Sequence, residues 1–141
     1  MFVFLVFASL GSVAQSRLAA ERNAVAFGGY DVTAFFDGKV VEGKPAHSLV
    51  YEDVKLLFVS EANKEAFSAN PKEYFPGYGG WCAIAMADGA FVIPDYRYYK
   101  IQDGKLLFFR VKAFFNGLTQ WNKDPDSNLI KANGNYSKYF K

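Results

Sequence analysis

The chain contains one cysteine, Cys82, so it cannot form a disulfide bond within itself. Its folded state must therefore be stabilised by an apolar core. Fifteen Phe, nine Tyr and two Trp among 141 residues supply the side chains for such a core. Without a short leader, the length matches one ordinary domain of about 100–150 residues. These properties predict a single domain that is held together by aromatic packing.

The first ten residues are apolar and uncharged, and Ser12-Val13-Ala14 follows them. This run is shorter than a bilayer span, which takes about 20 apolar residues. Small residues at its end are typical of a signal-peptidase site, with cleavage after Ala14, although no Lys or Arg precedes the apolar run. We therefore expect residues 1–14 to be a signal peptide and the mature chain to be periplasmic or secreted, with no integral membrane span. A buried N-terminal strand is the alternative.

The charged residues argue against a nucleic-acid partner. The formal net charge is only +2, and the Lys and Arg residues are scattered along the chain. Nucleic-acid-binding domains usually carry a basic patch or stripe. The glycine spacings that cradle phosphate groups, GxGxxG and the P-loop, are also missing from the sequence.

Two β-hairpins are predicted. Residues 47–51 and 54–59 are rich in side chains that suit strands and are separated by a short polar turn. Residues 98–101 and 105–109 flank a turn that contains a glycine. The polar residues 15–26 before the first hairpin predict a linker, with order beginning near Phe27.

Short helices are predicted around the hairpins. Ser60 is a good N-cap for one helix, and Asn70-Pro71-Lys72-Glu73 has the residue order of another helix start. Apolar residues at helical spacing predict an amphipathic helix over residues 111–121. Asp124-Pro125-Asp126 is expected to break that helix, and a last helix is expected over residues 129–140. Strands and helices mixed with tight turns indicate an α+β domain.

Cys82 follows a glycine pair, Gly79-Gly80, that allows a sharp turn. The alanine-rich residues 83–87 after it favour a helix that stops at Gly89. Cys82 is therefore expected at a helix N-terminus, where backbone N–H groups and the helix dipole stabilise a thiolate. A reactive or metal-binding sulfur would be presented in this way. A small buried, structural cysteine is the alternative.

An ordered set of motifs resembles the YHS domain family. The motifs are His47-Ser48-x-x-Tyr51, Phe58-x-Ser60, Phe67, Asn70-Pro71-x-x-Tyr74 and Tyr78-Gly79-Gly80-x-Cys82-Ala83. Gly29-Tyr30-Asp31 and Ala34-Phe35-Phe36 resemble elements of the longer, exported bacterial members. The resemblance runs from about Phe27 to the end of the chain. It implies one YHS-like α+β domain over residues 27–141, in which small antiparallel hairpins pack with short helices.

The resemblance implies a binding role. Many YHS domains are suspected heavy-metal binders, and some are attached to copper pumps, whereas the long exported members have no assigned activity. The metal-binding branch carries a Phe-Cys-Ser-x-x-Cys motif after the hairpin. Residues 58–63 read Phe-Val-Ser-Glu-Ala-Asn at the matching positions, so both sulfurs are missing. Ligand count therefore excludes a multi-thiolate zinc or copper site.

The candidate metal ligands are Cys82, His47 and Met86. His47 is the only histidine, and Met86 lies four residues after Cys82. On a helix Cys82 and Met86 share a face, and a thiolate with a thioether suits Cu(I), so copper is the expected cofactor of such a site. A polar strand edge for His47 and core packing for Met86 are the alternatives. Asp31 is expected to cap backbone N–H groups in a turn, with a pocket-lining role beside Cys82 as its alternative.

Three functions are consistent with these residues. The first is an exported binding module for a soft metal such as copper, held through Cys82. The second is a non-catalytic module that binds a protein or a small ligand and has a structural cysteine. The third is a thiol-dependent redox enzyme with His47 as the base, which would need an external thiol because no second cysteine exists. No Ser-His-Asp order or metal-hydrolase motif is present, and binding is therefore favoured over catalysis.

Overall fold

Antiparallel strand pairs form the sheet part of the fold. The computed structural model describes residues 15–140. In chain order its strands are β1 (Lys44–Tyr51), β2 (Val54–Phe58), β3 (Asp95–Gln102), β4 (Lys105–Phe109), β5 (Val111–Lys112) and β6 (Phe115–Asn116). β1 pairs with β2, β3 with β4 and β5 with β6, so these strands form three separate two-stranded sheets. The first two pairs confirm the predicted hairpins.

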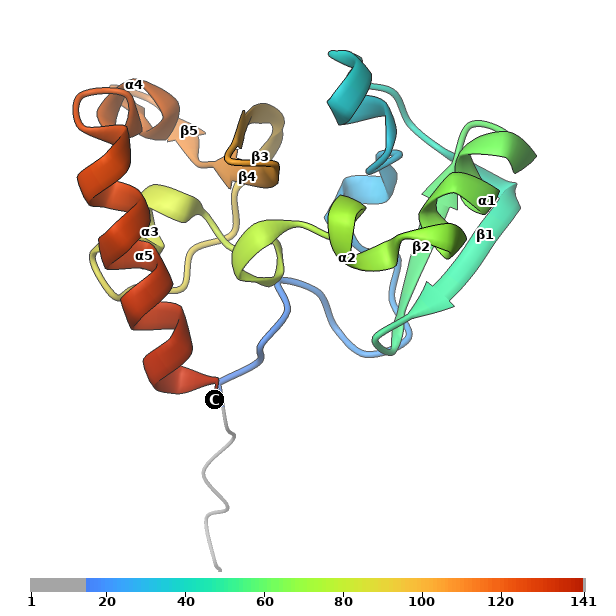
Figure 1. Ribbon diagram of the computed structural model, residues 1–141, viewed down its shortest axis with the longest axis horizontal. Helices are drawn as coiled ribbons and strands as arrows, with labels where there is room; N and C mark the ends of the chain where they lie inside the picture. Colours follow the sequence, from blue (N-terminus) through green and yellow to red (C-terminus); the bar gives the residue numbers. More distant parts are fainter. Residues whose placement is uncertain (1–14, 141) are drawn as a thin grey trace, which may run out of the picture.

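Short helices surround these hairpins. The α-helices are α1 (Glu61–Ala69), α2 (Pro71–Tyr74), α3 (Ala83–Ala87), α4 (Gly117–Trp121) and α5 (Pro125–Tyr139). Single 3-10 turns lie at η1 (Phe27–Gly29), η2 (Ala34–Asp37) and η3 (Gly77–Gly80). Figure 1 shows β1, β2 and α1 at one end of the molecule and α3, α4 and α5 at the other, with β3, β4 and η3 between them. The chain is thus a single α+β domain, as predicted.

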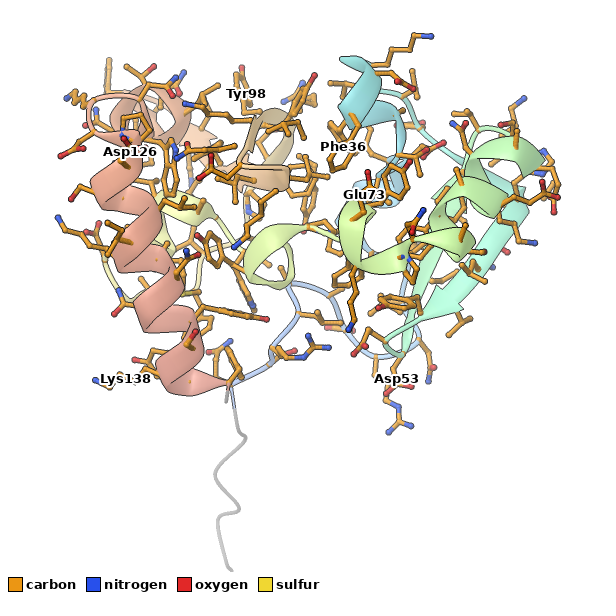
Figure 2. All side chains as sticks on the ribbon, in the orientation of Figure 1. Phe36, Asp53, Glu73, Tyr98, Asp126 and Lys138 are labelled. Carbon is orange, nitrogen blue, oxygen red and sulfur yellow. The ribbon has the colours of Figure 1, made fainter. Side chains whose placement is uncertain are left out.

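Side-chain caps explain where the longer helices begin. The Ser60 hydroxyl accepts a hydrogen bond from the Asn63 N–H at 3.1 Å, as predicted for the start of α1. A break does separate α4, which ends at Trp121, from the last helix, but the predicted start near residue 129 is wrong, because α5 begins at Pro125. The Asp124 carboxylate accepts from the Ser127 N–H at 3.3 Å, and Pro125 occupies the first helical turn, where proline is tolerated. Figure 2 shows Asp126 and Lys138 at opposite ends of α5, where their charges complement the helix dipole.

The predicted amphipathic helix over residues 111–121 is also wrong. The chain forms the β5–β6 hairpin there and then the short helix α4. The Gly117 N–H donates to the Arg110 carbonyl at 2.8 Å, and a Cβ at Gly117 would meet the same oxygen at 2.8 Å. This close backbone approach needs glycine and folds the segment back on itself. Phe114, which was expected on the apolar face of a helix, is fully exposed on the turn.

Strand β4 contributes to two separate hydrophobic cores. Leu106 and Phe108 belong to the first core, whereas Leu107 and Phe109 belong to the second. Neighbouring residues of a strand point to opposite faces, so one short strand supplies both cores. The first core also contains Phe27, Phe35, Phe58 and Phe67. The second also contains Trp81, Met86, Trp121 and Ala132.

The range 15–26, which was expected to be a linker, is packed against the rest of the domain. Leu18, Ala19 and Ala26 are buried, and the Ala19 N–H donates to the Gly79 carbonyl at 2.9 Å. In Figure 1 this segment runs from the C-terminal end of α5 toward the β1–β2 hairpin. The predicted signal peptide, residues 1–14, lies outside the described residues. Within residues 15–140, no helix has both the length and the apolar character to cross a membrane.

Candidate functional site

Cys82 lies at the N-cap position of α3, as predicted, and is fully buried. Its backbone N–H donates to the Val92 carbonyl at 2.9 Å, and an isolated parallel bridge connects it to Phe108 in β4. Its sulfur accepts a hydrogen bond from the Arg110 N–H at 3.2 Å. The thiol is therefore held in a fixed place beside the end of β4.

The glycine pair before Cys82 allows two close approaches. Gly79 has φ +61°, and a Cβ there would lie 2.0 Å from the Arg17 carbonyl oxygen. Gly80 has φ +85°, and a Cβ there would lie 2.4 Å from the Phe27 ring. Any side chain at either position would collide with its neighbour. The pair therefore lets the segment 15–26 and η1 pack directly against the turn that leads to Cys82.

Cys82 forms part of the wall of a pocket of about 600 Å³. One side of the pocket comes from α3 and the loop after it. The other side comes from the β5–β6 hairpin, α4 and the start of α5. The apolar residues that line it are Ile84, Ala85, Ala90, Val92 and Phe115. The pocket thus has a largely apolar interior between parts of the chain that are distant in sequence.

Charged side chains lie around this apolar lining. Two are cationic, Arg110 and Lys123, and two are acidic, Asp88 and Asp124. Lys123 donates to the Gln120 side chain at 2.9 Å, and Asp124 caps α5. Arg110 as a residue is half-buried, and its guanidinium makes no ion pair or side-chain hydrogen bond with any residue in the described range. Arg110 is therefore a cation of the pocket that has no protein partner there.

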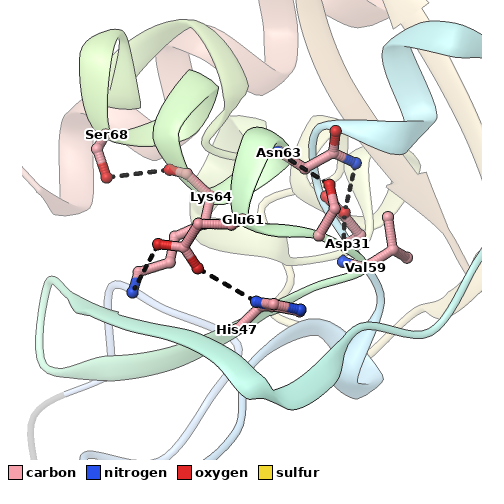
Figure 3. Close-up of polar contacts among 8 residues, drawn as sticks. Asp31, His47, Val59, Glu61, Asn63, Lys64 and Ser68 are labelled. Atoms are coloured by element: carbon pink, nitrogen blue, oxygen red, sulfur yellow. Dashed lines mark hydrogen bonds and ion pairs between the residues drawn. The ribbon is translucent and has the colours of Figure 1, made fainter.

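The other two predicted metal ligands do not line this pocket. His47 lies on β1, and its Nδ1 is 3.2 Å from the Glu61 carboxylate at the start of α1 (Figure 3). Met86 is fully buried in the second core, beside Trp121. Across residues 15–140, His, Cys, Asp and Glu side chains form no group of three or more that could hold a metal ion. Metal binding by Cys82, His47 and Met86 stays a prediction.

A buried polar network surrounds Asp31, which is fully buried (Figure 3). Its Oδ1 accepts from the Thr33 N–H at 2.9 Å and from the Thr33 hydroxyl at 2.7 Å. Its Oδ2 accepts from the Val59 N–H at 2.9 Å and from the Asn63 side-chain amide at 2.8 Å. The predicted capping role is confirmed, and the carboxylate also connects η2 to the start of α1. Asp31 does not line the Cys82 pocket.

A second polar cluster joins β4 to α5. The Tyr78 hydroxyl donates to the Asn133 side chain at 2.8 Å, and the Lys105 ammonium donates to the same oxygen at 3.2 Å. The ammonium also lies 5.2 Å from the centre of the Tyr78 ring. Burial raises the pKa of Tyr78 and lowers the pKa of Lys105. Both side chains therefore ionise less readily here than they do in water. The cluster serves to pack β4 and α5 together.

Sequence reasoning missed Arg110, Phe115 and Lys123 as pocket residues. Arg110 follows β4 directly, whereas Phe115 lies in the segment that was predicted to be helical. The chain reversal at the β5–β6 hairpin brings these residues to Cys82. Their spacing in the sequence therefore gives no sign that they lie near it. Comparisons of the chain with protein-family models, with curated proteins and with solved structures find no match.

Proposed function

We propose that this chain is a non-catalytic binding module that holds a small ligand in the Cys82 pocket. The observation that carries this proposal is the pocket itself. Small-molecule sites are usually concave, about 300–1,000 Å³ in volume, and mostly apolar, with a few polar groups that orient the ligand. A volume of about 600 Å³, an apolar lining and an Arg110 side chain that has no partner among residues 15–140 meet this description. The resemblance to exported YHS proteins supports the same class of function and an extracytoplasmic location.

The surroundings of the thiol support binding over thiol catalysis. The predicted thiol enzyme uses His47 as its base, and such a base lies within hydrogen-bond distance of the sulfur that it activates. The sulfur of Cys82 has the backbone N–H of Arg110 as its partner, and His47 instead contacts Glu61. Cys82 on this proposal is a packed wall residue of the pocket.

The proposal is tested with a fluorescent apolar probe, N-phenyl-1-naphthylamine, and two matched variants. Ala85→Trp places a large ring in the pocket, whereas Ala62→Trp places the same ring on an exposed position of α1. We expect saturable probe binding to the unmodified chain and to Ala62→Trp, and binding weakened at least about tenfold in Ala85→Trp. Thermal unfolding of both variants checks that each is folded. Equal probe binding by the two variants would contradict the proposal.

The soft-metal prediction is tested on the same preparation. Native mass spectrometry with added Cu(I), beside Cys82→Ser, detects any metal held by the thiol. A stoichiometric copper adduct that is lost in Cys82→Ser would support the soft-metal function in place of the small-ligand one. A mass that stays unchanged with Cu(I) would favour the small-ligand function.

A further inference from the structure

We propose that the ligand of the Cys82 pocket is an amphipathic anion, with its acidic head on Arg110 and its apolar body beside Ile84, Val92 and Phe115. This inference rests on the proposed function and names the class of ligand. It depends on three features of the pocket, which are the fixed backbone of Arg110, the balance of the neighbouring charges and the apolar lining.

The backbone of Arg110 is held on both sides. Its N–H donates to the Cys82 sulfur at 3.2 Å, and its carbonyl accepts from the Gly117 N–H at 2.8 Å. The position from which the side chain enters the pocket is therefore fixed, which lowers the entropy that a ligand must remove on binding.

Two of the four arginines have a carboxylate partner among residues 15–140, whereas Arg22 and Arg110 have none, and of these two it is Arg110 that lines the Cys82 pocket. Arg17 pairs with Glu52, and Arg97 pairs with Asp95. Arg110 is partly buried in the pocket wall and pairs with no carboxylate among residues 15–140. The planar fork of a guanidinium fits the two oxygens of a carboxylate or phosphate. A ligand with such a head would provide the missing partner.

The remaining charges of the pocket, Lys123, Asp88 and Asp124, all belong to exposed residues, whereas Arg110 is half-buried. Lys123 lies on the α4–α5 side and donates to Gln120. One oxygen of Asp124 is already occupied by the α5 cap. Asp88 is exposed at the end of α3, and exposed charges of either sign gain little from pairing with a ligand in water. The partly buried Arg110 is thus the charge that selects the ligand.

The apolar lining selects the other end of the ligand. Ile84 lies in α3, Val92 in the loop after α3, and Phe115 in β6, so apolar side chains face the pocket from both of its sides. Burying an alkyl chain among them is favourable, because each CH₂ group leaves water for an apolar surrounding. The ligand should therefore combine an acidic head with a hydrocarbon body.

Four ligands of equal chain length test this inference by displacement of N-phenyl-1-naphthylamine. They are decanoate, decyl phosphate, 1-decanol and decyltrimethylammonium, used below their critical micelle concentrations. We expect at least one of the two anions to displace the probe at a concentration about tenfold lower than 1-decanol does, because a charge-assisted hydrogen bond is roughly twice as strong as a neutral one. The better anion identifies the head group as a carboxylate or a phosphate. Decyltrimethylammonium should be the weakest of the four.

Two variants separate the role of Arg110 from a general effect of charge. Arg110→Gln should remove the preference for the anions and leave displacement by 1-decanol unchanged. Lys112→Gln removes a positive charge from β5 outside the pocket and should keep the preference. Equal displacement by the anions and 1-decanol, a preference for the cation, or failure of all four ligands to displace a bound probe would overturn this inference and leave the binding module intact. Failure of the probe to bind would instead overturn the proposed function.

Discussion

Replacing Asp31 by asparagine keeps the shape of the side chain but turns one acceptor oxygen into a donor. In the folded chain each carboxylate oxygen faces two donors, one of which is a backbone N–H group. The Thr33 hydroxyl and the Asn63 amide can rotate and present an acceptor instead. The N–H groups of Thr33 and Val59 cannot, so one of them must face the new NH₂ group.

The expected loss follows from these four bonds. A buried N–H that is left without an acceptor costs about 1–3 kcal/mol. The bonds that remain lose their charge assistance, and charge-assisted bonds are roughly twice as strong as neutral ones. Together these effects predict that Asp31→Asn lowers the free energy of unfolding by about 3 kcal/mol. For a domain of this size, such a loss lowers Tm by roughly 10 °C.

Urea unfolding and thermal melts followed by circular dichroism measure this loss. The matched control is Asp37→Asn, the same change at an exposed carboxylate in η2, which should stay within about 0.5 kcal/mol. The reasoning assumes that the four hydrogen bonds outweigh the cost of burying a carboxylate charge. An Asp31→Asn variant as stable as the unmodified chain, or more stable, would refute it.

Two further predictions concern Gly79 and Tyr96. Gly79→Ala should lower the free energy of unfolding by more than about 3 kcal/mol or prevent folding, because its Cβ would lie 2.0 Å from the Arg17 carbonyl oxygen. The control is Gly104→Ala, at a position with a similar φ and no atom within 4 Å, where the expected loss is about 1 kcal/mol. Equal melting temperatures for the two variants would contradict this prediction. Burial raises the pKa of Tyr96 from its usual value of 10.0 to about 12, so its neutral form stabilises the fold fully below pH 10, and this contribution is lost as the pH rises toward about 12. The free energy of unfolding, measured with urea across that pH range, should decline less steeply for Tyr96→Phe than for the unmodified chain. The control Tyr139→Phe, which changes an exposed ring, should behave like the unmodified chain.

Local signals predicted most of the secondary structure. The turns of the two long hairpins and the Ser60 cap depend on residues that are close in sequence, so the sequence alone identifies them. The Asp124-Pro125 start of α5 carries the same kind of signal as Asn70-Pro71 at the start of α2. Pro125 follows a helical pattern and therefore indicates the end of one helix, but it is also the first residue of the next helix, α5.

Long-range contacts decided what the sequence did not predict. Apolar residues over 111–121 happen to fall at helical spacing, but the backbone contact between Gly117 and Arg110 turns the segment into a hairpin. The polar residues 15–26 pack against the domain because Gly79 has no side chain and leaves room for the backbone of Arg17. The Cys82 pocket depends on the same hairpin. Its apolar and charged lining therefore had no signal in the sequence, although the helix-start position of Cys82 did.

The shared strand β4 leads to a prediction about cooperativity. Phe108 belongs to the first core, whereas both tryptophans, Trp81 and Trp121, belong to the second. Phe108→Ala should cost about 3–5 kcal/mol, and Phe114→Ala, at an exposed turn, less than about 0.5 kcal/mol. Because Leu107 and Phe109 lie on the same strand as Phe108, loss of the first core should unfold the second with it. Tryptophan fluorescence and circular dichroism should therefore give the same lowered midpoint for Phe108→Ala. A fluorescence midpoint that stays at the value of the unmodified chain would show that the two cores unfold independently.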